Sequence, residues 1–286
     1  MTHRHATLAL IFVTVLWGVS IVAIKYTFLD ASPLLGVGIR FGIGGLILAT
    51  QLKGLTRREL VAGLVIGVMF AGGVAFQNLG LTITTASRSA FIVALSALLT
   101  PALAAAVFRQ RVPRVIVVRI LVAMGGIFLL TAPGGPVSGL NRGDMLTLAA
   151  AILFAGQIVG VSHYAVGTST ARLLAIQFLV TSTVGFAGSA AIETPMLHLT
   201  PRLVLLFMVL ISTGILTFTL QLRAQRVVNA TEAALVFTFE PVAASIASYL
   251  VFAERLSAIQ LLGGLIIMIA VGWKRKSKEP VALPPV

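Results

Sequence analysis

Long apolar stretches recur along almost the whole chain, and short polar connections separate them. An α-helix needs about 20 apolar residues to cross the hydrocarbon core of a bilayer. An unpaired backbone group finds no water in that core, so such a segment is expected to cross as a helix. The sequence therefore predicts an all-α integral membrane protein with about ten transmembrane helices. The expected spans are Ala6–Phe28, Pro33–Leu52, Leu60–Phe76, Thr82–Phe108, Val115–Thr131, Asp144–His163, Arg172–Ile192, Leu203–Leu222, Ala230–Phe252 and Ala258–Trp273.

Charged residues are rare, at 10% of the chain, whereas 58% of the residues are hydrophobic. Soluble proteins carry about 25% charged residues, so most of this surface is expected to contact the lipid bilayer. The formal charge of +13 would suggest a nucleic-acid partner in a soluble protein, but here the basic residues lie in short loops between apolar stretches. We therefore expect no nucleic-acid partner.

The basic residues also predict how the chain is oriented in the membrane. If the N-terminus is cytoplasmic, most of the 21 Lys and Arg residues fall in loops on that side. Cytoplasmic loops of membrane proteins carry an excess of Lys and Arg. The pattern therefore predicts a multi-pass protein with both termini in the cytoplasm.

The two halves of the chain resemble each other weakly but in consistent order. The segment from Ala86 matches the segment from Ala230, and this register pairs Ser96 with Glu240. Earlier in each half, LWGVSIVAIKY matches FAGQIVGVSHY, and Arg40-Phe41 matches Gln177-Phe178. Five spans in each half would make the second copy enter the membrane in the opposite orientation. The expected repeats are residues 1–137 and 138–286, and inverted repeats are typical of secondary transporters.

The chain resembles the EamA family of the ten-span drug/metabolite transporter superfamily. The motifs that carry the resemblance are LWGVSIVAIKY followed by Ser32-Pro33, Arg40-Phe41, ASRSAFIVALSALLTP, NATEAALVFTFEPV and FAERLSAIQLLGG. The resemblance covers essentially the whole chain. It implies an exporter of small metabolites, often amino acids, that works by alternating access in the bacterial inner membrane. The chain departs from the family pattern at Ser96-Ala97, where many relatives have Ser-Pro, and in FRQRV, where an acidic residue usually precedes the Arg.

Glu240 is the acidic residue expected deepest in the membrane, about ten residues into its span and directly before Pro241. An ionisable side chain at that depth is costly and usually functional. Glu240 could carry protons or pair with a cationic group of the solute. The alternative, weighed equally, is a glutamate that bonds backbone groups freed by Pro241.

Further candidates are polar or aromatic side chains within the spans. Arg40 is either a clamp for a solute carboxylate or, as we favour, a residue that bonds carbonyl groups between helices. Several others could hydrogen-bond a polar solute, although bonding between helices is the alternative for each; they are Trp17, Gln77, Asn78, Gln157 and Gln221. Phe239 could form an apolar wall for an amphipathic solute.

These features favour a secondary transporter of a small solute over two other classes. An intramembrane enzyme is disfavoured because the sequence contains neither G-x-S-x-G nor H-E-x-x-H, and no Cys. A non-transporting membrane scaffold remains open. We expect no cofactor and no metal, and the doubled fold is compatible with a monomer. Proton antiport, uniport and facilitated diffusion all remain open, as does the identity of the solute.

Overall fold

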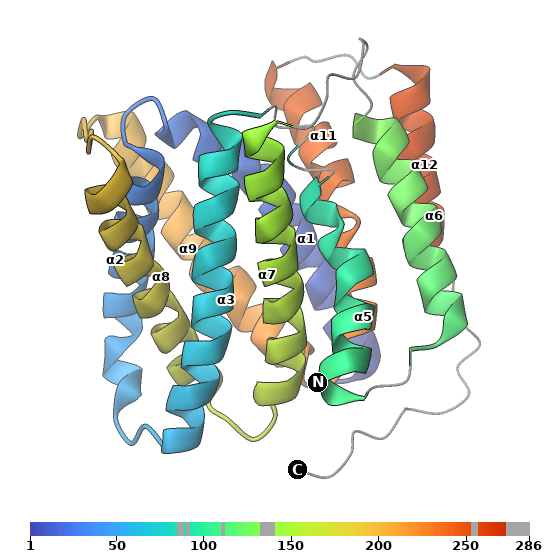
Figure 1. Ribbon diagram of the computed structural model, residues 1–286, viewed down its shortest axis with the longest axis horizontal. Helices are drawn as coiled ribbons and strands as arrows, with labels where there is room; N and C mark the ends of the chain where they lie inside the picture. Colours follow the sequence, from blue (N-terminus) through green and yellow to red (C-terminus); the bar gives the residue numbers. More distant parts are fainter. Residues whose placement is uncertain (85–88, 90–91, 110–111, 132–140, 253–256, 273–286) are drawn as a thin grey trace.

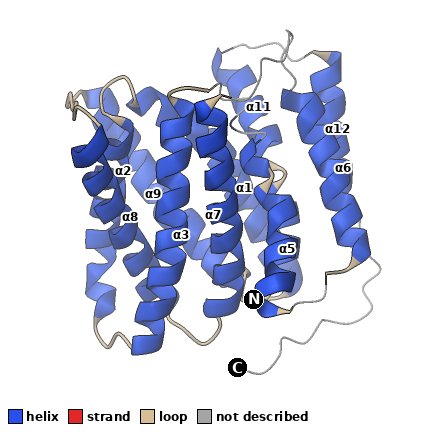
Figure 2. Ribbon diagram, viewed as in Figure 1, coloured by secondary structure: helices blue, strands red, loops and turns tan. Residues whose placement is uncertain are grey.

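The computed structural model describes residues 1–84, 89, 92–109, 112–131, 141–252 and 257–272. Within these residues all regular secondary structure is helical, and loops and one isolated β-bridge between Ala31 and Leu197 make up the rest (Figure 2). The helices are α1 (His3–Thr27), α2 (Pro33–Leu48), the 3-10 helix η1 (Ala49–Leu52), α3 (Arg57–Leu81), α5 (Ser96–Phe108), α6 (Arg114–Thr131), α7 (Arg142–Tyr164), α8 (Thr170–Ile192), α9 (Pro201–Ala224), α10 (Ala230–Phe237), α11 (Glu240–Phe252) and α12 (Ala258–Gly272).

Six of these helices are long and apolar enough to cross a membrane, which agrees with the predicted helical membrane protein. They are α1, α2 with η1, α3, α7, α8 and α9. The others are shorter or broken, so the number of spans stays a prediction. The predicted boundary between the two repeats lies outside the described residues.

The predicted span over Ala230–Phe252 is not one continuous helix in the structure. The segment instead forms two helices, because α10 ends at Phe237 and α11 begins at Glu240. Pro241 is the physical reason, since proline lacks the N–H that a helix interior requires and its ring clashes with the preceding turn. Pro241 is the second residue of α11, where the backbone N–H has no partner within the helix and no preceding turn meets the proline ring.

The span predicted over Thr82–Phe108 also differs from a single helix. Helix α3 extends to Leu81, a turn follows it, and residues 92–94 are already helical before α5 begins at Ser96. Part of the intervening segment lies outside the described residues.

Small residues let the long helices pack closely side by side, as Figure 1 shows for α2, α8, α3 and α7. Gly185 of α8 faces the backbone of α2, and a Cβ added there would lie 2.5 Å from the Gly38 nitrogen. Gly63 and Gly67 of α3 bring that helix against Ile176 and Val180 of α8. Without a hydrophobic driving force between helices in lipid, such close packing is a main source of association.

Two loops are joined at the end of the bundle opposite the N-terminus. Asp30, in the loop between α1 and α2, accepts hydrogen bonds from the Arg202 guanidinium at 2.7 and 3.1 Å and from the Thr200 hydroxyl at 3.2 Å. Ser32 and Met196 exchange two further bonds between the same loops. The hydrogen bonds from Arg202 hold the pKa of Asp30 below its ordinary value, against the opposing effect of burial, and His198 adds a smaller attraction.

We expect Asp30→Asn to lower the thermal unfolding midpoint of the purified protein in detergent at neutral pH. Because the pKa of folded Asp30 is depressed, its stabilisation is fully present above the ordinary aspartate pKa of about 4. That stabilisation is lost as the pH falls through the lower folded value. The gap between wild type and variant should therefore shrink in acid, and it should also vanish in an Arg202→Gln background. A gap that is the same at every pH would contradict this.

Candidate functional site

A cavity of about 200 Å³ lies among the helices, and side chains from both halves of the chain line it. Its lining comes from α1, α2, α3, α5, α7, α8 and α9, and from the break between α10 and α11. We call the end of the bundle where α1 begins the N-side. The lining continues away from the N-side as far as Ile24 and Leu81, near the ends of α1 and α3.

Aromatic rings form much of the cavity wall. Trp17 lies 5.4 Å from Phe218 and 5.2 Å from Phe237, measured between ring centroids. Phe218 lies 4.7 Å from Phe70, edge to face. Two more rings, those of Phe41 and Phe178, continue the series at centroid distances of 5.0 to 5.8 Å. Edge-to-face and tilted contacts of this kind are favourable, so the rings stabilise one another in an apolar wall.

Paired polar groups close the cavity toward the N-side. The amides of Gln157 on α7 and Gln221 on α9 bond each other reciprocally at 3.3 and 3.5 Å. The Trp17 indole N–H donates to the Thr217 hydroxyl at 3.1 Å, which joins α1 to α9. Because these polar groups hydrogen-bond one another, the aromatic wall is the main surface that remains for a solute to contact.

Other polar groups in the lining keep free bonding capacity. Asn78 donates through Nδ2 to the Val74 carbonyl at 2.7 Å, but its buried Oδ1 has no partner among the described residues. Gln77 is half-buried on the same turn of α3 and also lines the cavity. A polar solute could therefore bond these amides.

Glu240 enters the cavity at the first turn of α11, immediately after the helix break. Its carboxylate is half-buried and has no ion-pair or hydrogen-bond partner in the part of the chain that the structure describes. Gly18 sets its position, because a Cβ on Gly18 would lie 2.8 Å from the Glu240 carbonyl and 2.7 Å from the Ala244 nitrogen. Helix α1 therefore touches the backbone of α11 at this point.

Arg40 supplies a positive charge to the same cavity. Its guanidinium carbon lies 4.8 Å from the centre of the Phe41 ring, within the range of a cation–π contact. No carboxylate partner for Arg40 is found among the described residues. The cavity thus holds one acidic and one basic side chain, neither of them paired by a described residue.

The structure brings together every predicted site residue except Phe239. The residues that share the cavity are Trp17, Arg40, Gln77, Asn78, Gln157, Gln221 and Glu240. Phe239 instead packs beside the cluster that contains Ile116, Ile120 and Ile267, on the side of α6 and α12. The sequence analysis missed Phe41, Phe70, Phe154, Phe178 and Phe218, which line the cavity. Nothing in an apolar span distinguishes such a phenylalanine from one that faces lipid.

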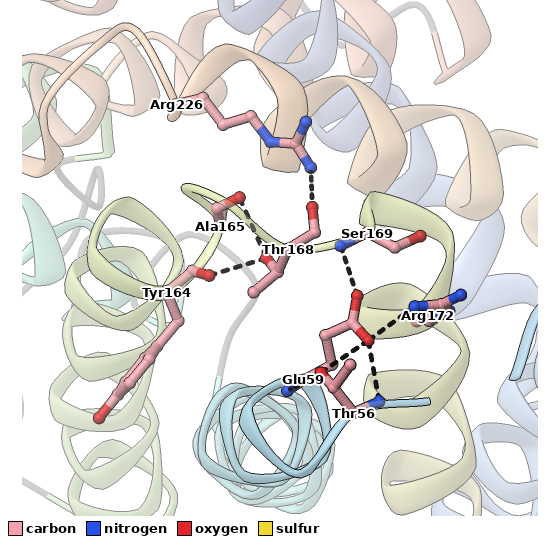
Figure 3. A network of polar contacts seen from close by, with 8 residues as sticks. All are labelled: Thr56, Glu59, Tyr164, Ala165, Thr168, Ser169, Arg172 and Arg226. Carbon is pink, nitrogen blue, oxygen red and sulfur yellow. Dashed lines mark hydrogen bonds and ion pairs between the residues drawn. The ribbon is translucent and has the colours of Figure 1, made fainter. Parts of the chain in front are cut away.

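A polar network lies at the N-side, and Figure 3 shows it from close by. Glu59 caps the start of α3 together with Thr56, and it also accepts from the Ser169 backbone N–H at 2.9 Å and from Arg172 at 2.8 Å. Arg226 donates to the Thr168 carbonyl at 2.6 Å. The network joins the start of α3, the loop between α7 and α8, and the loop between α9 and α10.

Comparisons with known proteins agree with this architecture. A model of the EamA-like transporter family matches residues 5–132 and again residues 141–273. An uncharacterized transporter of Archaeoglobus fulgidus is 29% identical over 270 residues, which cover 93% of this chain and 84% of that protein. A solved crystal structure of a protein with 19% identity aligns with a TM-score of 0.76 and covers 94% of this chain and 96% of that one. The last similarity concerns the fold alone.

We expect Gly18→Leu to disturb the cavity, because the new side chain would press on the backbone of α11 beside Glu240. Overpacking of this kind typically costs about 1–3 kcal/mol of stability. The measurement is the thermal unfolding midpoint of the purified protein. Val19→Leu is the matched control, since Val19 is 48% exposed and offers room for a larger side chain. Equal midpoints for Gly18→Leu and Val19→Leu would contradict the close contact of α1 with α11.

Proposed function

Because this chain belongs to the EamA-like transporter family, we propose that it is a secondary transporter that exports a small amphipathic solute across the bacterial inner membrane by alternating access. The observation that carries the proposal is the cavity, which is walled by aromatic rings, contains Glu240 and Arg40, and is closed toward the N-side. A simple membrane anchor has no need of unpaired charges at such a place.

The lining suggests which solutes fit. A volume of about 200 Å³ is below the range of about 300–1,000 Å³ that is typical of pockets for drug-sized ligands, so a small molecule is favoured. The aromatic wall suits an apolar group, whereas Glu240 and Arg40 suit a cationic and an anionic group. An amino acid combines these three features, and the half-buried Gln77 adds a hydrogen-bonding group.

Two antiparallel repeats would provide the alternating access. The family model matches the chain twice, once in each half. In Figure 1, α1 begins at the lower end of the bundle and α7 at the upper end, as inverted copies would. The contacts agree with that symmetry, because α1 packs on α9 as α3 packs on α7. In this proposal residues 1–137 and 138–286 form the repeats, α10 and α11 together make one span, and both termini are cytoplasmic.

Glu240 is the proposed coupling group. An acid without a described partner in a cavity can bind a proton or a cationic solute group in one conformation and release it in the other. Arg40 would then bind the solute carboxylate, a role that its cation–π contact with Phe41 leaves available.

The proposal is tested by reconstitution. Protein in liposomes should exchange radiolabelled amino acids from a panel that includes aromatic and aliphatic members, and the solute should emerge chemically unchanged. Conversion of the solute would indicate an enzyme. Failure of the whole panel and of other small metabolites to move would favour a scaffold.

For Glu240→Gln we expect flux to fall by about tenfold or more, which corresponds to ~1.4 kcal/mol in the barrier, and to lose its response to a pH gradient. The control is Glu232→Gln, which alters an acid at the start of α10, outside the cavity. Both variants should retain the wild-type circular dichroism spectrum. Wild-type flux with an unchanged pH response in Glu240→Gln would exclude Glu240 as the coupling group.

A further inference from the structure

Two glutamines near the N-side have buried amide atoms without partners. Gln177 on α8 is fully buried, and neither Nε2 nor Oε1 of its side chain has a hydrogen-bond partner among the described residues. Gln225, just after α9, is also buried, and its Oε1 is unpartnered in the same way. An unsatisfied buried polar group typically costs about 1–3 kcal/mol, so such groups call for an explanation.

The internal repeat relates both glutamines to the cavity. Gln177 occupies the position in α8 that Arg40 occupies in α2, because Arg40-Phe41 matches Gln177-Phe178. The register that pairs Gln77 with Gln221 places Gln225 opposite Leu81. Arg40 and Leu81 both line the cavity. The two unsatisfied glutamines are therefore the counterparts of cavity-lining residues.

On α7, too, the counterparts of cavity-lining residues are buried. On α1, Ser20 and Ile24 line the cavity and are half-buried. Their counterparts in the match of LWGVSIVAIKY with FAGQIVGVSHY are Ile158 and Ser162, and both are buried. Gln225 covers them, because its Nε2 donates to the Ile158 carbonyl at 3.0 Å and to the Ser162 hydroxyl at 2.9 Å. Ile158 still borders the cavity, whereas Ser162, one helical turn nearer the N-side, does not.

The network in Figure 3 joins α3, α8 and the loop after α9 at the N-side. Arg226, the neighbour of Gln225, bonds the Thr168 carbonyl, and Glu59 joins α3 to Arg172 at the start of α8. Arg172 lies five residues before Gln177, which is ~7.5 Å along a helix. Separation of these contacts would free α3 from α8, where Gln177 lies against Gly67, and the loop after α9 from α8, near Gln225.

We propose that Gln177 and Gln225 are solute-contacting groups of the transport path on the N-side, buried in this conformation and exposed when the Glu59–Arg172 network opens. This assignment rests on the proposed function and concerns the part of the transport path between the cavity and the N-side. In an inverted-repeat transporter the two halves exchange conformations, so residues that correspond in the repeat line the path in alternate states. The N-side path thus presents neutral amides where the open side presents Arg40, and it would bind the polar groups of the same solute through hydrogen bonds.

The chain contains no cysteine, so single cysteines can report exposure directly. The protein is placed in lipid nanodiscs, where a water-soluble maleimide reaches both faces, and no solute is needed. We expect Gln177→Cys to react slowly in the otherwise unchanged protein and about tenfold faster with Glu59→Gln, which corresponds to ~1.4 kcal/mol in the equilibrium between the states. Gln77→Cys, on the open side, should react more slowly in the same background.

Ser189→Cys is the matched control, because Ser189 on α8 is also buried and its hydroxyl has no hydrogen-bond partner in the described part of the chain. Its repeat counterpart, Leu52, does not line the cavity. Its reactivity should stay low in both backgrounds. If Glu59→Gln does not fold, Arg172→Gln breaks the same contact from the other helix. Equal reactivity of the cysteines at 177 and 189 in the opened background would overturn the proposal.

For Gln177→Leu we expect slower solute flux together with a higher thermal unfolding midpoint. The substitution removes an unsatisfied buried amide, which relieves a cost in the closed conformation and withdraws a bonding group from the open one. If Gln177 had a purely structural role, Gln177→Leu would instead lower the thermal unfolding midpoint. A lower midpoint, or flux equal to wild type, would therefore contradict the assignment.

These measurements distinguish failure of the inference from failure of the proposed function. Solute flux without a change in reactivity at position 177 would leave the transporter intact and remove the assigned path. Alternating reactivity at positions 177 and 77 without flux of any tested solute would support the two conformations and argue against transport.

Discussion

The bilayer requires every backbone group in its hydrocarbon core to be bonded within the protein, and the arrangement of the cavity follows from this constraint. Helices satisfy it along α1, α3 and the other long spans. Only where protein or a wet cavity surrounds the chain can a helix break, and α10 breaks before Glu240 beside the aromatic wall. The break therefore places an acidic side chain, at the first turn of a new helix, in a cavity where its charge can be solvated.

Close backbone contacts keep this arrangement in place. Gly18 brings α1 against the backbone of α11 at Glu240, and Gly185 brings α8 against α2 at Gly38. Lipid tails give helices little reason to associate through apolar area alone, so shape and small residues decide which helices meet. Ion pairs near the helix ends complete the assembly, with Asp30 and Arg202 at one end of the bundle and Glu59 and Arg172 at the other.

The cavity is asymmetric although the chain is internally repeated. Ser20, Ile24 and Leu81, which line it on α1 and α3, are half-buried, whereas their repeat counterparts Ile158, Ser162 and Gln225 are buried. Identical packing of both halves would leave the path either open at both ends or closed at both. In the proposed transporter a difference between the halves permits one open and one sealed side, and the Gln177 amide, which has no hydrogen-bond partner among the described residues, lies on the side that we propose is sealed.

The sequence by itself determined the membrane class, the family resemblance and most of the polar cavity residues, because a charge or amide inside an apolar stretch is visible without coordinates. It placed Glu240, Arg40 and Gln221 among the candidates for this reason. It could not distinguish Phe218, which lines the cavity, from Phe239, which packs beside α6, because an aromatic residue has the same character in either place. Only the tertiary structure decided which rings share a wall, where α10 ends and which side is sealed, since these depend on contacts between segments far apart in the chain.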